Sequence, residues 1–218
     1  MTLFVAAMLP VLVSLGLWQL DRGAEKRTME SDYLAKLTEL PREPGLEARF
    51  ADFQRLRLKG SFTDEVFLVD NQIHDGRVGY WVMQGFETLD RRKFVLNRGF
   101  LGASQDRAVL PFVPTPQQEL VVIGMVWPFT GLVPVLDDDA WGQGWPKRVQ
   151  RADIKRMAEF IGAADVEIRL EAGAGTLVPA PFAARLSDDI HRGYAATWFG
   201  LAIALVILYI IYGFKSED

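Results

Sequence analysis

The sequence contains no cysteine and only two histidines, His74 and His191, among its 218 residues. The absence of cysteine excludes disulfide bonds, thiolate-bound iron–sulfur clusters, CxxC redox chemistry and a cysteine nucleophile. It also removes the soft thiolate ligands of Cu(I) and structural zinc, and the scarcity of histidine makes copper delivery an unfavoured function. The formal net charge of −4 gives no reason to expect nucleic-acid binding.

Charged residues are nearly absent from both ends of the chain, although the middle has an ordinary polar and apolar mixture. A helix of about 20 apolar residues crosses the ~30 Å hydrocarbon layer of a membrane. We therefore expect transmembrane helices at residues 1–20 and 193–214 and an extramembrane domain at residues 21–192. The first span lacks a basic region and a small-residue cleavage site, which favours an anchor over a cleaved signal peptide.

Two spans would place both termini on one side of the membrane and the domain on the other. The connection is long, so the positive-inside rule does not decide the orientation. Antiparallel spans would also bring residues 16–22 and residues 191–198 to the same membrane interface. Both segments are rich in polar and aromatic side chains, more than a plain anchor requires.

Short alternating segments in the middle predict strands at 54–62, 66–69, 79–86, 93–100, 119–126 and 166–170. Helical periodicity at 21–40 predicts that the first span continues as an amphipathic helix, and a second helix is expected at 152–161. A turn is expected at 70–76 and a long irregular loop at 127–146. The fold class is therefore α+β, with a mainly antiparallel sheet or small barrel-like domain between two transmembrane helices.

His191 is the more interesting histidine because it lies at the start of the second span. If that helix begins near Ser187, then His191, Tyr194, Ala195 and Trp198 share one face. An imidazole beside aromatic side chains in an amphiphilic setting can be an axial ligand of haem iron. The alternative is an interfacial side chain that contacts lipid headgroups. His74 is expected to be an exposed loop residue.

Three further residues have both a structural and a functional interpretation. Trp18 is either an interfacial anchor or a stacking partner for a ligand between the spans. Arg22 either extends to lipid phosphates or binds a charged ligand. Arg98 either forms a surface ion pair or binds a carboxylate such as a haem propionate. No catalytic triad, phosphate-binding glycine loop or HExxH motif is present, so we do not expect an enzyme.

Several motifs along the chain resemble the surfeit-locus-protein-one family. They are Leu15-Gly-Leu-Trp-Gln-Leu-Asp-Arg22 with Lys26, Leu56-Arg-Leu-Lys-Gly-Ser-Phe62, the segment before Gly79-Tyr-Trp, Val95-Leu-Asn-Arg-Gly-Phe100 and His191-Arg-Gly-Tyr-Ala-Ala-Thr-Trp-Phe199. Each motif alone is modest. Together they occur in the family's order around two spans and cover nearly the whole chain.

The resemblance implies an assembly factor for a haem–copper terminal oxidase of the cytochrome c oxidase type. It implies binding of haem a, with His191 as the iron ligand, and insertion of that haem into the large oxidase subunit. Trp18, Tyr194 and Trp198 would then surround the macrocycle, and Arg22, Arg98 and Arg192 are the candidates to bind its carboxylates. The alternative is a membrane scaffold or accessory subunit that docks on the oxidase without haem.

The same resemblance implies a location and partners. It favours a bacterial inner membrane, cytoplasmic termini and a periplasmic domain. The implied partners are the large oxidase subunit, the enzyme that makes haem a, and membrane lipid.

Overall fold

The computed structural model describes residues 2–45, 49–129, 131, 132, 134, 141–179 and 188–215. The chain divides into two units, one formed by Met1–Ala35 with Pro181–Asp218 and the other by Lys36–Ala180. The first unit contains the long terminal helices α1 (Thr2–Leu37) and α3 (Asp189–Lys215). The second contains α2 (Ile154–Ile161) and the strands β1 (Arg55–His74), β2 (Arg77–Thr88), β3 (Lys93–Gly102), β4 (Leu120–Trp127), β5 (Lys147–Val149) and β6 (Glu167–Leu170).

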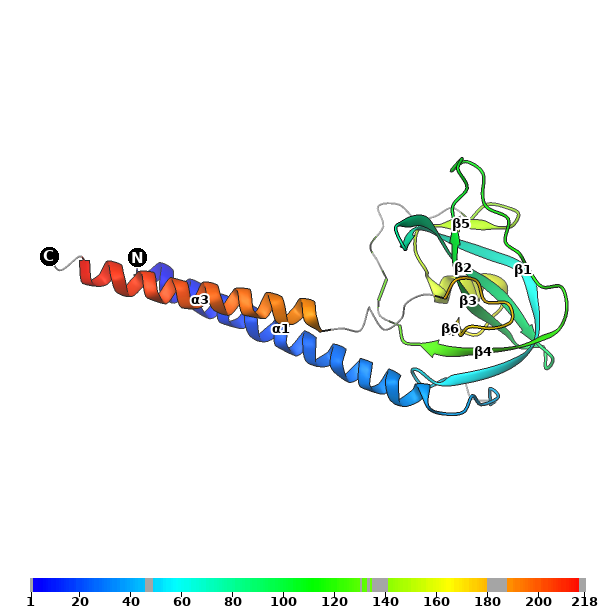
Figure 1. Ribbon diagram of the computed structural model, residues 1–218, viewed down its shortest axis with the longest axis horizontal. Coiled ribbons are helices and arrows are strands. Elements are labelled where there is room, and N and C mark those ends of the chain that lie inside the picture. The colour runs from blue at the N-terminus through cyan, green and yellow to red at the C-terminus, as the bar shows by residue number, and fades with distance from the viewer. Residues whose placement is uncertain are drawn as a thin grey trace. The chain divides into compact units, whose positions relative to one another are not determined.

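The described strands form one six-stranded sheet in the order β2-β3-β6-β4-β1-β5, and β1 also pairs with β2 (Figure 1). Five strands therefore close into a ring, with β5 added to β1 outside it. Most neighbours are antiparallel, but β3–β6 and β1–β5 are parallel. The α+β fold with a mainly antiparallel, barrel-like sheet is thus as expected.

Ring closure depends on Gly60. The first part of β1, up to Gly60, pairs with β4, and the strand pairs with β2 from Gly60 onward. A Cβ atom at Gly60 would lie only 2.0 Å from the carbonyl oxygen of Glu87. Only glycine allows this close approach of two backbones.

The core of this sheet unit has separate clusters on different faces. One cluster draws on all five strands of the ring, and its members are Leu56, Leu58, Phe62, Phe86, Phe94, Leu96, Val122, Val126, Ile168 and Leu170. A second cluster contains Phe67, Trp81 and Met83 and is covered by Met157, Ala158 and Ile161 of α2. The helix is capped at its start by Asp153, whose side chain accepts from the backbone of Arg156.

One local expectation was wrong, and one strand was not predicted. The turn expected at 70–76 is only Asp75-Gly76, with φ values of 48° and 72°, because β1 continues past Val69 to His74. Such positive φ values suit the tight turn of a two-residue hairpin. The strand β5 had no sequence signal, since three residues are too few to show alternation. Ser187, the expected start of the last helix, lies outside the described residues.

Arg98 on β3 is the most deeply buried charged side chain described in this unit, with 2% of its surface exposed. Its guanidinium donates to Gln84 Oε1 at 2.5 Å, Pro114 O at 2.7 Å and Gly175 O at 2.7 Å. It also lies over the ring of Phe62, 4.5 Å from the centroid. Burial lowers the pKa of Arg98 to about 10, so the group stays charged at neutral pH. The side chain therefore joins two loops to the sheet.

We predict that Arg98→Met destabilises the protein by about 3–5 kcal/mol, because the buried Gln84 amide and two partly buried backbone carbonyls lose their donor. The midpoint of urea unfolding, followed by tryptophan fluorescence in detergent, measures the change. The matched control is Arg91→Met, since the Arg91 side chain is 87% exposed and, among the described residues, pairs with Glu87 alone. That control should cost less than about 1 kcal/mol. Equal midpoints for both variants would contradict the structural role of Arg98.

Candidate functional site

The helices α1 and α3 lie side by side and antiparallel, with both chain ends at the same end of the pair (Figure 1). Each contains a window long and apolar enough to cross a membrane. Near the termini, the hydroxyl of Tyr209 donates to Thr2 Oγ1 at 3.2 Å. At the other end, Arg27 of α1 forms an ion pair with Asp188. This arrangement fits a two-pass membrane protein.

Small residues line the contact between the two helices. Gly16 and Gly23 are among the few buried residues of α1, and Ala195 and Ala202 are buried on α3. A Cβ atom at Gly16 would lie 2.6 Å from the ring of Phe199, so the glycine makes room for that ring. Small residues allow membrane helices to approach closely, because apolar side chains gain nothing from leaving lipid.

His191 contacts a polar side chain in the contact surface between α1 and α3, which we call the seam. Its Nδ1 atom lies 2.8 Å from Oε1 of Gln19, which is 9% exposed. An amide oxygen only accepts, so Nδ1 donates and Nε2 of the neutral imidazole carries no proton. Within the described part of the chain, Nε2 has no hydrogen-bond partner. The ring is therefore held through one nitrogen and retains a lone pair on the other.

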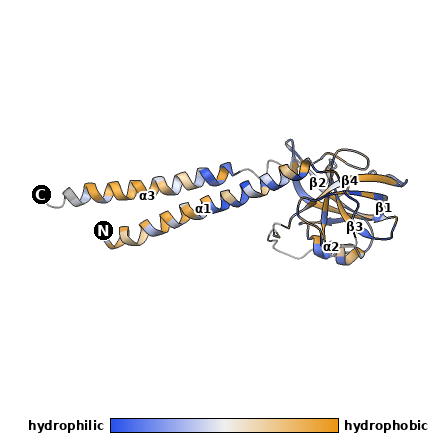
Figure 2. Ribbon diagram, turned by 90° about the horizontal axis from the view of Figure 1, so that it is seen from below, coloured by the Kyte–Doolittle hydropathy of each residue, from blue (hydrophilic) through white to orange (hydrophobic). Residues whose placement is uncertain are grey.

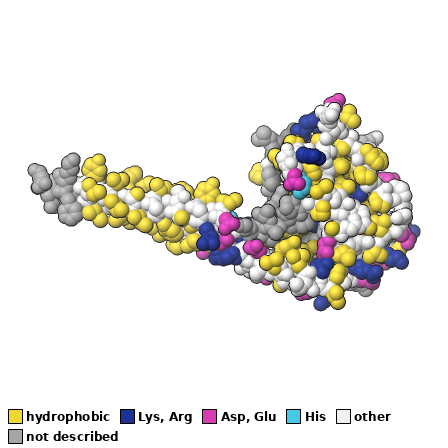
Figure 3. Space-filling view, in the orientation of Figure 1, with side chains coloured by type: hydrophobic (Ala, Val, Ile, Leu, Met, Phe, Trp, Pro, Cys, Tyr) yellow, Lys and Arg dark blue, Asp and Glu magenta, His cyan; other side chains and the backbone are white. Residues whose placement is uncertain are grey.

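The His191–Gln19 contact lies where the apolar part of the helix pair meets its charged part. Both helices are hydrophobic toward the chain ends and hydrophilic toward the opposite end (Figure 2). Charged side chains gather at that opposite end, while hydrophobic side chains cover most of the remaining surface (Figure 3). A position of this kind suits a ligand with an apolar body and charged groups.

The other residues predicted on the helices are more exposed. Trp18 and Tyr194 are 50% and 55% exposed, and Arg192 also faces outward. Arg22 pairs with Glu25 at 2.7 Å and lies 6.0 Å from the centroid of the Trp18 ring. Trp198 is partly buried and follows His191 by about two turns of α3. These side chains provide aromatic and cationic groups on the same helix pair as His191.

Two predicted residues belong to the sheet unit instead. Arg98 is bonded to three protein acceptors, so it would have to leave them to bind a carboxylate, and we remove it from the candidate site. His74 is not an exposed loop residue: it ends β1, its side chain is only 15% exposed, and its ring lies 5.3 Å from that of Phe100. The described residues hold no cluster of three or more His, Asp or Glu side chains arranged for a metal ion.

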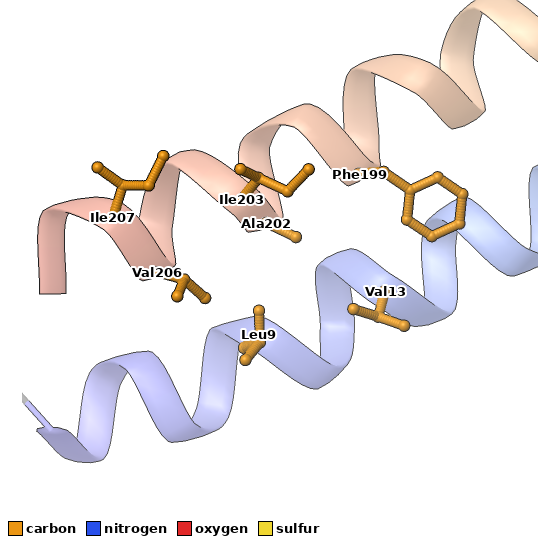
Figure 4. A pocket seen from close by; sticks show the side chains of 7 residues that line it. All are labelled: Leu9, Val13, Phe199, Ala202, Ile203, Val206 and Ile207. Carbon is orange, nitrogen blue, oxygen red and sulfur yellow. The ribbon is translucent and has the colours of Figure 1, made fainter. Parts of the chain in front are cut away.

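An apolar groove of about 500 Å³ runs along the helix pair farther into the hydrophobic part (Figure 4). It is lined by Leu9, Val13, Phe199, Ala202, Ile203, Val206 and Ile207. All of these side chains are apolar. Phe199 at its near end follows His191 by roughly 12 Å along α3, at ~1.5 Å per residue. The groove therefore suits hydrocarbon, and His191 lies beyond its end.

The role of Gln19 was not predicted from the sequence, although its polar side chain stands in an apolar segment. Glutamine is out of place in an apolar run, and a polar side chain inside a membrane segment usually has a partner. Gly23 was also missed; a Cβ there would lie 3.6 Å from the Cβ atoms of both Asp188 and His191. Neither partner could be identified without knowing the register of the two helices.

The absence of native cysteine allows a direct test of this register. We predict that Gly23→Cys combined with Asp188→Cys forms a disulfide on mild oxidation, because the two Cβ atoms would be 3.6 Å apart. Disulfides need a Cβ separation of about 3.5–4.5 Å. Loss of labelling by a maleimide reagent after oxidation measures the bond.

The control pairs Gly23→Cys with Gly193→Cys. A Cβ atom at Gly193 meets no atom within 4 Å, so this position faces away from α1. Full labelling of both thiols is expected in that variant after the same oxidation. If the two double variants became equally protected from labelling, the register of the helix pair would be incorrect.

A profile of the SURF1 family matches residues 6–203. Similar proteins include a SURF1-like protein of Rickettsia felis, 26% identical, with 96% of this chain and 95% of the relative aligned. A SURF1-like protein of Rickettsia conorii is 25% identical, over 93% of this chain and 86% of the relative. The chain therefore belongs to the SURF1 family.

Proposed function

We propose that this protein binds haem a and helps to insert it into the large subunit of a cytochrome c oxidase-type terminal oxidase. Proteins of the SURF1 family are generally oxidase assembly factors, and the family is not one of known enzymes. The observation that carries the haem-binding part is the orientation of His191. Its Nδ1 is bonded to Gln19, and its Nε2 is the nitrogen left to bind iron.

The residues around His191 fit a haem in their chemistry. A haem has a wide apolar face, an iron that accepts an imidazole nitrogen, and two carboxylates at one edge. Trp18, Tyr194 and Trp198 supply aromatic surface on the same helix pair. Arg22 and Arg192 are exposed cations that can bind carboxylates, whereas Arg98 is engaged within the sheet unit.

A single histidine ligand suits a protein that passes its cargo on. His191 is the only histidine on the helix pair, so this chain would supply a single histidine ligand to the haem. A single ligand would hold the haem less firmly than a pair of histidines would. The proposed partners are the large oxidase subunit, which receives the haem, the enzyme that makes haem a, and the surrounding lipid.

The proposed location is the inner membrane of a bacterium, with both termini cytoplasmic and the sheet unit periplasmic. The two apolar helices support a two-pass arrangement. Both termini lie at the same end of the helix pair, which supports a common side for them (Figure 1).

The alternative is a scaffold or accessory subunit that docks on the oxidase without haem. One observation favours it: the hairpin of β1 and β2 ends in exposed apolar side chains, with Ile73 71% and Val78 43% exposed. Exposed apolar groups of this kind can contact another protein. The haem content of the purified protein separates the two functions, since a scaffold needs none.

We predict that His191→Ala abolishes haem binding in protein purified from a host that makes haem a. Wild type should carry close to one haem per chain by pyridine haemochrome assay, with a histidine-ligated optical spectrum, and the variant should carry almost none. The matched control is His74→Gln, the other histidine, which should keep both the haem content and the spectrum. Unchanged haem in His191→Ala would reject His191 as the ligand, and wild type without haem would favour the scaffold.

A further inference from the structure

We propose that Gln19 is the positioning residue for His191: it holds the proton on Nδ1, directs Nε2 to iron, and keeps the iron–histidine bond weak enough for transfer. This inference rests on the proposed haem binding. It concerns a residue on α1, 172 positions from the histidine in sequence, whose amide oxygen lies 2.8 Å from Nδ1.

The burial of Gln19 supports a specific contact. Its side chain is 9% exposed, between the buried glycines Gly16 and Gly23 on the same face of α1. A Cβ at Gly23 would come within 3.6 Å of the His191 Cβ, so the glycine keeps this part of the seam open. A buried amide in an apolar helix needs a partner, and His191 is the one that the structure provides.

The direction of the hydrogen bond sets which nitrogen can bind a metal. A neutral imidazole has one N–H and one lone pair, and the hydrogen bond made by one nitrogen determines the state of the other. An acceptor at Nδ1 keeps the proton there and leaves the lone pair on Nε2. Without Gln19, the proton would distribute between both nitrogens, and a fraction of the protein would present the wrong one.

The neutrality of the acceptor is as important as its position. In many metal sites a carboxylate accepts a hydrogen bond from this N–H group and makes the imidazole a stronger ligand. Here Asp188 lies close to the seam, but its carboxylate is paired with Arg27. The amide of Gln19 orients the ring without adding charge, so the bond to iron stays weaker than with a carboxylate.

A purely structural role for the same contact predicts different results. Interhelical hydrogen bonds also stabilise membrane helix pairs. If Gln19 only held the helices together, its replacement would weaken the pairing of α1 and α3. In protein that still formed the pair, the tautomer of His191 and its strength as a ligand would not change. Helix pairing must therefore be measured beside the ligand, and the disulfide between positions 23 and 188 can report it.

The first experiment uses haem-free protein in detergent, labelled with ¹⁵N at histidine. Only two imidazoles give signals, and His74→Gln assigns them. We expect His191 to carry its proton on Nδ1 in wild type and in Gln19→Glu. In Gln19→Leu we expect a mixture or the Nε2-protonated form. The wild-type pattern in Gln19→Leu would overturn the proposal without reference to haem.

The second experiment loads wild type, Gln19→Leu and Gln19→Glu with haem a. Loss of the orienting contact should reduce haem affinity by about 10–100-fold in Gln19→Leu. Gln19→Glu should keep the haem, raise the iron–histidine stretching frequency in the resonance Raman spectrum, lower the midpoint potential and slow haem transfer to apomyoglobin severalfold. The control is Ser14→Leu, an exposed polar-to-apolar change on the same helix, which should match wild type.

The outcomes separate this proposal from the proposed function. Wild type without haem overturns haem binding, while the tautomer measurement still decides the role of Gln19 in orienting the ring. A different result is that wild type binds haem while both Gln19 variants keep the same haem affinity, Raman frequency and midpoint potential. That result would overturn the role proposed for Gln19 and would leave haem binding intact. If haem affinity changes while the 23–188 disulfide still forms, the positioning role of Gln19 is supported. If haem affinity changes only in variants in which that disulfide does not form, Gln19 acts in helix pairing.

Discussion

The hydrogen bond between His191 and Gln19 is the contact on which the proposed site depends. A membrane offers few partners to a buried polar group, so each of these side chains needs the other. The bond can form only because the helices at the two ends of the chain pair in one register. Small residues permit that register, with Gly16 receiving the Phe199 ring and Gly23 lying against His191. The proposed binding site and the packing of the helices thus depend on the same contact surface between α1 and α3.

The two units use buried polar groups in opposite ways. In the sheet unit, the guanidinium of Arg98 donates hydrogen bonds to Gln84, Pro114 and Gly175. A group held by three acceptors and an aromatic ring stabilises the fold and has little capacity left for a ligand. In the helix pair, the contacts of the His191 imidazole with described residues use one of its two nitrogens. The second nitrogen of His191, which has no hydrogen bond within the described residues, makes this side chain the proposed binding group, and its burial does not.

Sequence patterns predicted most helices and strands but not the contacts between distant segments. Apolar runs and alternation predict the two long helices and most strands, because burial selects side chains with the period of each element. The continuation of β1 to His74 was hidden by polar residues, since register shifts after Phe62 and Val69 change which side chains face the core. The roles of Arg98 and Gln19 depend on contacts between distant segments, and no local pattern encodes these. The two motifs around Gly60 and Gly99 point to backbone packing, because a Cβ at either position would lie within about 2.3 Å of a carbonyl oxygen.

A protein that transfers a haem has to bind it without retaining it. Strong ligation by two histidines, or by one histidine with a carboxylate behind it, would favour retention. This chain has one histidine on the helix pair and an amide as its acceptor, and Asp188, which also lies against Gly23, is paired with Arg27. The aromatic and cationic groups near it are largely exposed, so a bound ligand would remain accessible to a partner within the membrane. These features together favour a site for temporary binding over one for a permanent cofactor.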